Sequence, residues 1–143
     1  MIIREAGILF HGTPIVYTNY QKAGNINLNL ICTSKLIREL LCFSKCIIPP
    51  IEYFEGLDYS IVIKKGTFNN AYGEKQEILA FIVLGKDYKI EMNLRTKILP
   101  LLENLLAKFL DQYNGRELLN LEQFEGFKTT INKVLEQYQF VKT

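Results

Sequence analysis

The chain has 143 residues with 17 Lys and Arg against 15 Asp and Glu, a formal net charge of +2, and 48% of its residues are hydrophobic. This length is typical of one domain with its own core, and the scattered basic residues, with the pair Lys64 and Lys65 not extended, argue against nucleic acid as a partner. No stretch approaches the about 20 apolar residues of a transmembrane helix, and Arg4 and Glu5 interrupt the region where a signal peptide is apolar.

The first third of the chain predicts a hairpin followed by a helix. Residues 2–10 and 15–20 are rich in β-branched and aromatic residues, and the turn signal His11-Gly12-Thr13-Pro14 separates them. Apolar residues then recur at helical spacing between residues 28 and 46, and Pro49-Pro50 forbids any continuation because proline lacks the backbone N–H. The apolar stripe of this helix is formed by Leu36, Ile37, Leu40, Leu41 and Phe43.

Three further strands are predicted in the middle of the chain. Residues 51–54 and 59–65 are short β-rich runs, and residues 66–76 form a polar connecting loop. Residues 77–84 have no polar face, which is typical of a strand buried on both sides of its sheet. Residues 6–10 are similarly apolar, so these two runs are the candidates for the centre of the sheet.

Two amphipathic helices are expected at the end of the chain. The first carries one long apolar stripe from Leu94 to Phe109 and stops at Asn114-Gly115. Pro100 lies inside this stripe, so we expect either a kink there or a helix that begins nearer Leu99. The last helix is marked by Phe124, Phe127, Ile131, Val134 and Tyr138.

The cysteines indicate a reducing compartment. Cys32, Cys42 and Cys46 are odd in number and form no CxxC pair that could hold zinc or exchange disulfides. Cys42 and Cys46 could share a helical face, but no His or further Cys lies near them, so packing is favoured over metal binding. We expect one cytoplasmic domain over residues 1–143, without a metal or cofactor.

This order of elements, β-β-α-β-β-β-α-α, predicts a mixed α/β (α+β) domain. A sheet whose central strands are apolar on both faces needs cover on both faces, so we expect a three-layer α-β-α sandwich around a five-stranded, mainly antiparallel sheet. The stretches AGILFHGTPIVYTNY, IEYFEGLDYSIVIKKG and LEQFEGFKTTINKVLEQY resemble, in their placement, the longin-like (profilin-like) family of trafficking domains. The resemblance implies the sheet order second, first, fifth, fourth, third.

The sequence departs from that family at two places. Pro100 falls within the long penultimate helix, and no coiled-coil SNARE segment follows the domain, so the chain resembles a stand-alone longin-like subunit. The related roadblock fold begins with a helix before its first hairpin, whereas this chain is expected to begin with a strand.

Motifs for catalysis are missing from the sequence. No GxxxxGK[ST] phosphate loop is present, and His11 has no Ser, Cys or carboxylate partner at a recognisable spacing. The carboxylate pairs Glu52/Glu55 and Glu122/Glu125 are of a kind found on any solvated face. Arg4-Glu5 is expected at the end of its strand, because a charged pair in a central strand must be frayed or paired. We therefore expect no enzyme.

The candidate binding residues lie on the expected sheet edges and on the first helix. In the resembling fold, residues 15–20 and 51–54 are exposed edge strands that invite a partner strand, although their aromatic residues could instead pack beneath the adjoining helices. Longin-like domains also take peptides in a groove between the first helix and its neighbouring strand. The candidate partner-binding residues are Tyr17, Tyr20, Leu36, Leu40, Phe43, Tyr53 and Phe54.

Three functions stay open at this point. The leading hypothesis is a binding subunit that docks on a small GTPase, or on another longin- or roadblock-like chain, in regulation of the membrane-trafficking type. The alternatives are a regulatory subunit that accelerates guanine-nucleotide exchange and, from a different class, a small-molecule sensor. Homodimerisation by sheet extension or helix packing is compatible with the same edges, as is peripheral membrane association through a partner.

Overall fold

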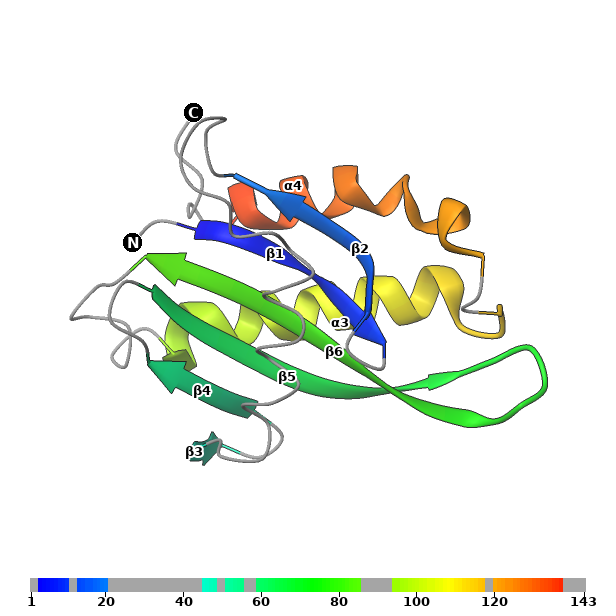
Figure 1. Cartoon of the computed structure of the whole chain (residues 1–143), viewed down its shortest axis with the longest axis horizontal. Coiled ribbons are helices and arrows are strands. Elements are labelled where there is room, and N and C mark those ends of the chain that lie inside the picture. Colours follow the sequence, from blue (N-terminus) through cyan, green and yellow to red (C-terminus); the bar gives the residue numbers. More distant parts are fainter. Residues whose placement is uncertain are drawn as a thin grey trace.

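An antiparallel sheet with two α-helices packed on one of its faces forms the fold (Figure 1). This computed structural model describes residues 3–10, 13–20, 45–48, 51–55, 59–85, 94–117 and 120–137. The strands are β1 (Ile3–Phe10), β2 (Thr13–Asn19), β3 (Lys45–Ile48), β4 (Ile51–Glu55), β5 (Tyr59–Asn69) and β6 (Lys75–Gly85). A π-helical turn, η1 (Leu94–Ile98), leads into α3 (Leu99–Tyr113), and the 3-10 turn η2 (Leu121–Phe124) precedes α4 (Phe127–Gln137).

The described sheet has six strands in the order β2-β1-β6-β5-β4-β3, and every neighbouring pair is antiparallel. The five strands expected from the sequence lie in the order that the resemblance implies. The expected total of five is nevertheless wrong, because β3 adds a sixth strand beyond β4.

β3 also corrects the end of the first predicted helix. Lys45 and Cys46 were expected to be helical, but they pair with Tyr53 and Glu52 of β4. Pairing with a neighbouring strand overrides a helical pattern that local sequence favours. The remainder of that predicted helix, residues 28–44, lies outside the described part of the chain. The described residues therefore show two layers, one sheet and one helical layer, and the expected third layer stays a prediction.

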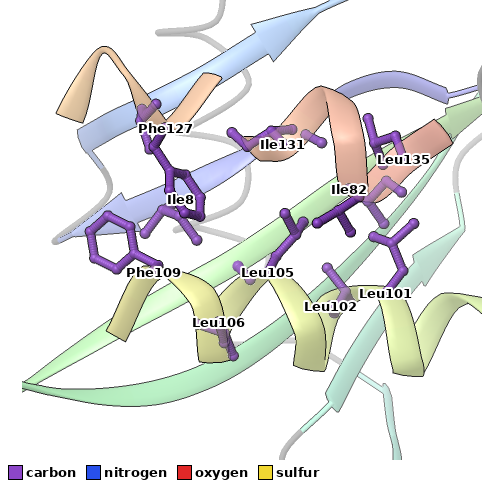
Figure 2. Packing of buried hydrophobic residues seen from close by; sticks show 14 of the residues in the cluster. Ile8, Ile82, Leu101, Leu102, Leu105, Leu106, Phe109, Phe127, Ile131 and Leu135 are labelled. Carbon is purple, nitrogen blue, oxygen red and sulfur yellow. The ribbon is translucent and has the colours of Figure 1, made fainter. Parts of the chain in front are cut away.

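The helix-side face of the sheet carries the larger part of the core. Alternate residues of the strands point toward α3 and α4, as the two-residue period of a strand dictates. Figure 2 shows side chains of both helices converging on Ile8 of β1 and Ile82 of β6, among them Leu101, Leu105, Ile131 and Leu135. At one end of this core, five aromatic rings pack around one another: Phe68, Phe109, Tyr113, Phe124 and Phe127.

The opposite face of the sheet holds a second, smaller apolar cluster. It is formed by residues of β1, β5 and β6, although neither α3 nor α4 lies on this face. The prediction that residues 77–84 are buried on both faces is confirmed for 78–84, which are all buried. The members of this opposite-face cluster are Leu9, Ile61, Ile63, Leu79, Phe81 and Val83, with Tyr17 packed against them.

The sequence expectation at Pro100 is also resolved. α3 begins at Leu99, and Pro100 lies in its first turn, where the missing N–H removes no hydrogen bond of the helix. The helix ends at Tyr113, and the next residues are Asn114 and Gly115, as the stop signal predicts. Gly115 has φ +89°, a conformation that favours glycine.

β5 and β6 continue as a long hairpin past the other strands (Figure 1). Residues 66–76 were expected to form a loop, but strand pairing persists to Asn69 and Lys75, and only residues 70–74 form the turn. Phe68 is buried against Phe109 of α3, and this packing extends the strand where local composition suggests a loop. Gly66 allows β5 to lie this close to α3, since a Cβ at this position would meet the Leu106 side chain at 3.2 Å.

Candidate functional site

The strand β2 is the last in the sheet order, and no described strand lies beyond it. Its sequence, TPIVYTN, contains no charged residue. Unpaired edges in natural proteins commonly carry charges that discourage strand addition, so an uncharged edge is a candidate for pairing with a partner strand. The expected edge at residues 15–20 therefore agrees with the position of β2.

The alternation of an antiparallel pair decides which backbone groups of β2 point outward. The Tyr20 N–H donates to the Arg4 carbonyl of β1 at 2.8 Å. Residues two apart share a direction, so Thr18 and Val16 also direct their backbone groups toward β1. Tyr17, between them, directs its N–H and C=O away from β1, toward the open side of the described sheet.

The first half of β2 is less suited to pairing. Pro14 has no N–H to donate, and the register with β1 shifts between Ile8 and Leu9, which leaves a bulge at Ile15. Both features oppose strand addition, so the stretch that could accept a partner starts at Val16.

Tyr17 is held in place from two sides. It lies opposite Gly7 of β1, where a Cβ would come within 2.8 Å of the Tyr17 Cα. Glycine therefore lets β2 lie this close to β1. The half-buried ring packs against the opposite-face cluster, and the Lys128 Nζ of α4 lies 5.8 Å from its centroid in a cation–π contact.

Tyr20 ties the end of β2 to α4. Its hydroxyl donates a hydrogen bond to Asn132 Oδ1 of α4, and its ring packs against the helix-side core. Burial raises the pKa of Tyr20 above its ordinary value, so this hydroxyl stays protonated. Tyr20 thus fixes the position of the edge, and only part of its ring is exposed.

The second expected edge, residues 51–54, is wrong. β4 lies between β3 and β5 and is not an edge strand. Tyr53 is 5% exposed in the helix-side core, so the alternative, packing beneath the helices, holds for this residue. Phe54 pairs with Ile61 through its backbone, and its side chain lies outside what the structure describes. Three candidates and the groove built on them lie outside the described residues: Leu36, Leu40 and Phe43.

Glu5 is a buried carboxyl beside the β2 edge that sequence reasoning placed at a strand end. It lies inside β1, is 1% exposed, and its Oε1 accepts a hydrogen bond from Asn19 Nδ2 at 3.2 Å. Its Oε2 has no hydrogen-bond partner. Burial raises the pKa of Glu5 to about 7. No local sequence signal distinguishes this Glu from a frayed one, because its burial comes from the strands on either side.

The outward sides of the helices are polar. α3 exposes Glu103, Lys108 and Asp111, and α4 exposes Asn132 and Lys133. Among the residues that the structure describes, the large hydrophobic side chains with substantial exposure are Tyr72 at the turn of the β5–β6 hairpin, 75% exposed, and Leu121 of η2, 41% exposed. The described helix surface therefore offers no apolar stripe for a partner.

Comparisons of the chain with models of protein families, with curated proteins and with solved structures found no match. No helix in the described ranges is long and apolar enough to cross a membrane. Within the same ranges, no group of three or more His, Cys, Asp or Glu residues is placed to hold a metal ion.

Proposed function

We propose that this chain is a non-catalytic protein-binding subunit that pairs through β2 with a small GTPase or with another longin- or roadblock-like chain. The observation that carries the proposal is the uncharged strand β2 at the end of the described sheet, with the backbone of Tyr17 directed outward. The resemblance of the sequence to longin-like domains supports it, since the implied strand order agrees with that of β2, β1, β6, β5 and β4. In this proposal the protein works in the cytoplasm and reaches membranes through its partner.

Pairing at this edge would use the chemistry of strand addition. The partner supplies an extended segment whose backbone bonds to the outward groups of β2, and its side chains meet those of β2 on either face. Tyr17 is already fixed by Gly7, the opposite-face cluster and Lys128, so little side-chain freedom is lost when a partner strand covers it. Such a preorganised edge gives up less entropy on binding than a loop.

A pair of substitutions at position 17 tests the edge directly. Tyr17→Ala removes the ring and keeps the outward N–H, whereas Tyr17→Pro removes both and leaves the bonds of Val16 and Thr18 to β1 in place. The tagged chain and both variants serve as bait in native lysate at physiological salt, and mass spectrometry identifies the retained proteins. We expect the wild type to retain a small GTPase or a longin- or roadblock-like chain, Tyr17→Ala to retain less, and Tyr17→Pro to lose it.

The control for this test is the fold of the baits, checked by circular dichroism and thermal unfolding. Equal retention by Tyr17→Pro and Tyr17→Ala would show that the outward N–H takes no part in binding and would reject the β2 edge as the site. If a GTPase is retained, release of a fluorescent nucleotide from it separates two roles. An unchanged release rate identifies a plain binder, and an accelerated rate identifies an exchange regulator.

A further inference from the structure

The end of α3 and the β5–β6 hairpin meet at the sole Asn-Gly dipeptide of the sequence, Asn114-Gly115. The Asn114 Oδ1 accepts a hydrogen bond from the Asn69 N–H at 2.8 Å, and the Gly115 N–H donates to the Asn69 carbonyl at 2.7 Å. Both Asn114 and Gly115 are exposed. The hairpin thus binds the side chain of Asn114 and the backbone of Gly115 at the same time, although both residues are exposed to solvent.

Asn-Gly dipeptides have a chemistry of their own, because glycine offers no side chain to hinder attack by its amide nitrogen. The deprotonated Gly115 nitrogen bonds to Cγ of Asn114, and the side-chain amide leaves as ammonia with the proton it gains. The resulting succinimide then takes up one water, which breaks one of its two C–N bonds. The product is Asp or isoaspartate at position 114, and asparagine is for this reason a thermolabile residue.

The geometry of the hairpin contact opposes this ring closure. The Gly115 N–H is engaged with the Asn69 carbonyl, and the Asn114 amide is oriented by the Asn69 N–H. The backbone of Asn114 has φ −57° and ψ 136°. Ring closure needs the peptide C–N bond to eclipse the Cα–Cβ bond, a rotation about ψ that pulls the Gly115 N–H away from Asn69. The reaction therefore requires the end of α3 to separate from the hairpin.

We propose that Asn114 is a latent deamidation site that the β5–β6 hairpin keeps unreactive while it is docked on α3. The two products differ in their consequence. An Asp side chain still offers an oxygen to the Asn69 N–H, whereas isoaspartate adds a methylene to the backbone and shifts Gly115 out of register with Asn69. Formation of isoaspartate thus converts a transient separation of hairpin and helix into a permanent one.

The test follows deamidation of the full chain at neutral pH and 37 °C by peptide mapping and mass spectrometry, with separation of Asp and isoaspartate at position 114. The reference is the same chain unfolded in urea. We expect the folded chain to deamidate at least about tenfold more slowly, because the hydrogen bonds to Asn69 must open before the ring can close. A tenfold slower rate corresponds to an equilibrium constant of about ten in favour of the hydrogen-bonded state. Equal rates in the folded and unfolded chains would overturn the proposal.

Two variants separate local opening from global unfolding. Asn70→Ala removes the Oδ1 that accepts from the N–H groups of Tyr72 and Glu74, at 2.9 Å each, and so loosens the hairpin turn. Ile131→Val trims the core under α4, away from the hairpin, and lowers global stability. We expect deamidation of Asn114 to accelerate several-fold in Asn70→Ala and to stay near the wild-type rate in Ile131→Val. Equal acceleration in both variants would show that Asn114 reacts only after global unfolding. The proposal that the docked hairpin keeps Asn114 unreactive would then be wrong.

Discussion

The two faces of the central sheet are buried by different physical means. The helix-side face is covered by α3 and α4 and filled by large side chains, with five aromatic rings at one end. The opposite face carries a smaller apolar cluster. The same face also holds Gly7, which admits a close backbone approach, and Glu5, a buried carboxyl. The stability of the helix-side face thus depends on the volume of its side chains, whereas the stability of the opposite face depends on close backbone approach and on the protonation of Glu5.

This difference determines what each face tolerates. A filled apolar core loses stability with each methylene removed, at any pH, because the lost contacts carry no charge. On the opposite face, a residue that is too large or a charge that is unpaired does the damage. Substitutions on the two faces should therefore differ in size and in pH dependence.

The largest effect is expected at the aromatic cluster of the helix-side face. Phe109 is fully buried and contacts four other rings: Phe68, Tyr113, Phe124 and Phe127. Phe109→Ala should lower the free energy of unfolding by about 4 kcal/mol through the cavity it leaves. Urea denaturation followed by circular dichroism measures this, with the exposed Leu121→Ala as control. A loss equal to that of the control would contradict the volume-dependent account of this face.

The next largest effect is expected where β1 and β2 approach each other. A Cβ at Gly7 would overlap the Val16 carbonyl and come within 2.8 Å of the Tyr17 Cα, both of them backbone atoms that cannot move alone. Gly7→Ala should cost about 3 kcal/mol in stability and separate the edge strand from β1. Gly126→Ala is the matched control, because a Cβ there meets nothing within 4 Å. Urea denaturation measures both variants. Equal denaturation midpoints would show that the close approach of β1 and β2 at Gly7 does not limit the size of the residue there.

The buried carboxyl makes the opposite face sensitive to pH. Burial raises the pKa of Glu5 from its ordinary value of 4.5 to about 7. Between these values the folded state binds more protons than the unfolded state, so stability falls as the pH rises from 4.5 to 7. Above pH 7 both states are ionised and the loss stays constant, and below pH 4.5 both are protonated and no loss remains.

Glu5→Gln should remove this dependence. The variant keeps the shape of the protonated carboxyl and its oxygen for Asn19, so we expect it to be more stable than the wild type by about 2 kcal/mol at pH 8 and equal to it at pH 4.5. Urea denaturation at pH 4.5, 6 and 8 measures the difference, with the exposed Glu122→Gln as control. A wild type whose stability is flat between pH 4.5 and 7 would show that burial does not raise the pKa of Glu5.

The smallest effect is expected at the contact between α3 and the hairpin. Asn114→Ala removes the oxygen that accepts from the Asn69 N–H and should cost about 1 kcal/mol. Hydrogen exchange should show faster exchange of the hairpin amides around Asn69, with the sheet centre unchanged. Asn120→Ala is the control, because the exposed Asn120 at the start of η2 makes no side-chain capping hydrogen bond. Unchanged protection at Asn69 would mean that other contacts hold the hairpin.

Much of this fold could be predicted from local sequence. The β-branched and aromatic content of residues 2–10 and 15–20 located β1 and β2, and the run 77–84 without a polar face located the strand buried on both sides. The start of α3 beside Pro100 was one of the two alternatives expected at this proline, the other being a kink. These features depend on residues close to one another in the chain.

The features that were missed depend on partners distant in sequence. β3 takes its conformation from pairing with β4, and residues 66–69 of β5 from the packing of Phe68 on Phe109. At the candidate site, the edge at β2 could be predicted, whereas β4 lost its edge position to a strand that the helical pattern concealed. The burial of Glu5 had no local signal, since its neighbours Asn19 and Val83 come from other strands.

The position of β1 between β2 and β6 has a consequence during synthesis. Ile3 pairs with Leu84, so the hairpin at the start of the chain cannot complete its sheet until the chain beyond residue 84 has left the ribosome. Until then, one side of an apolar strand lacks its hydrogen-bonding neighbour, and such an edge is prone to pair with other chains. Elevated temperature or a shortage of chaperones during synthesis should therefore cause more aggregation of the nascent chain than of the finished protein.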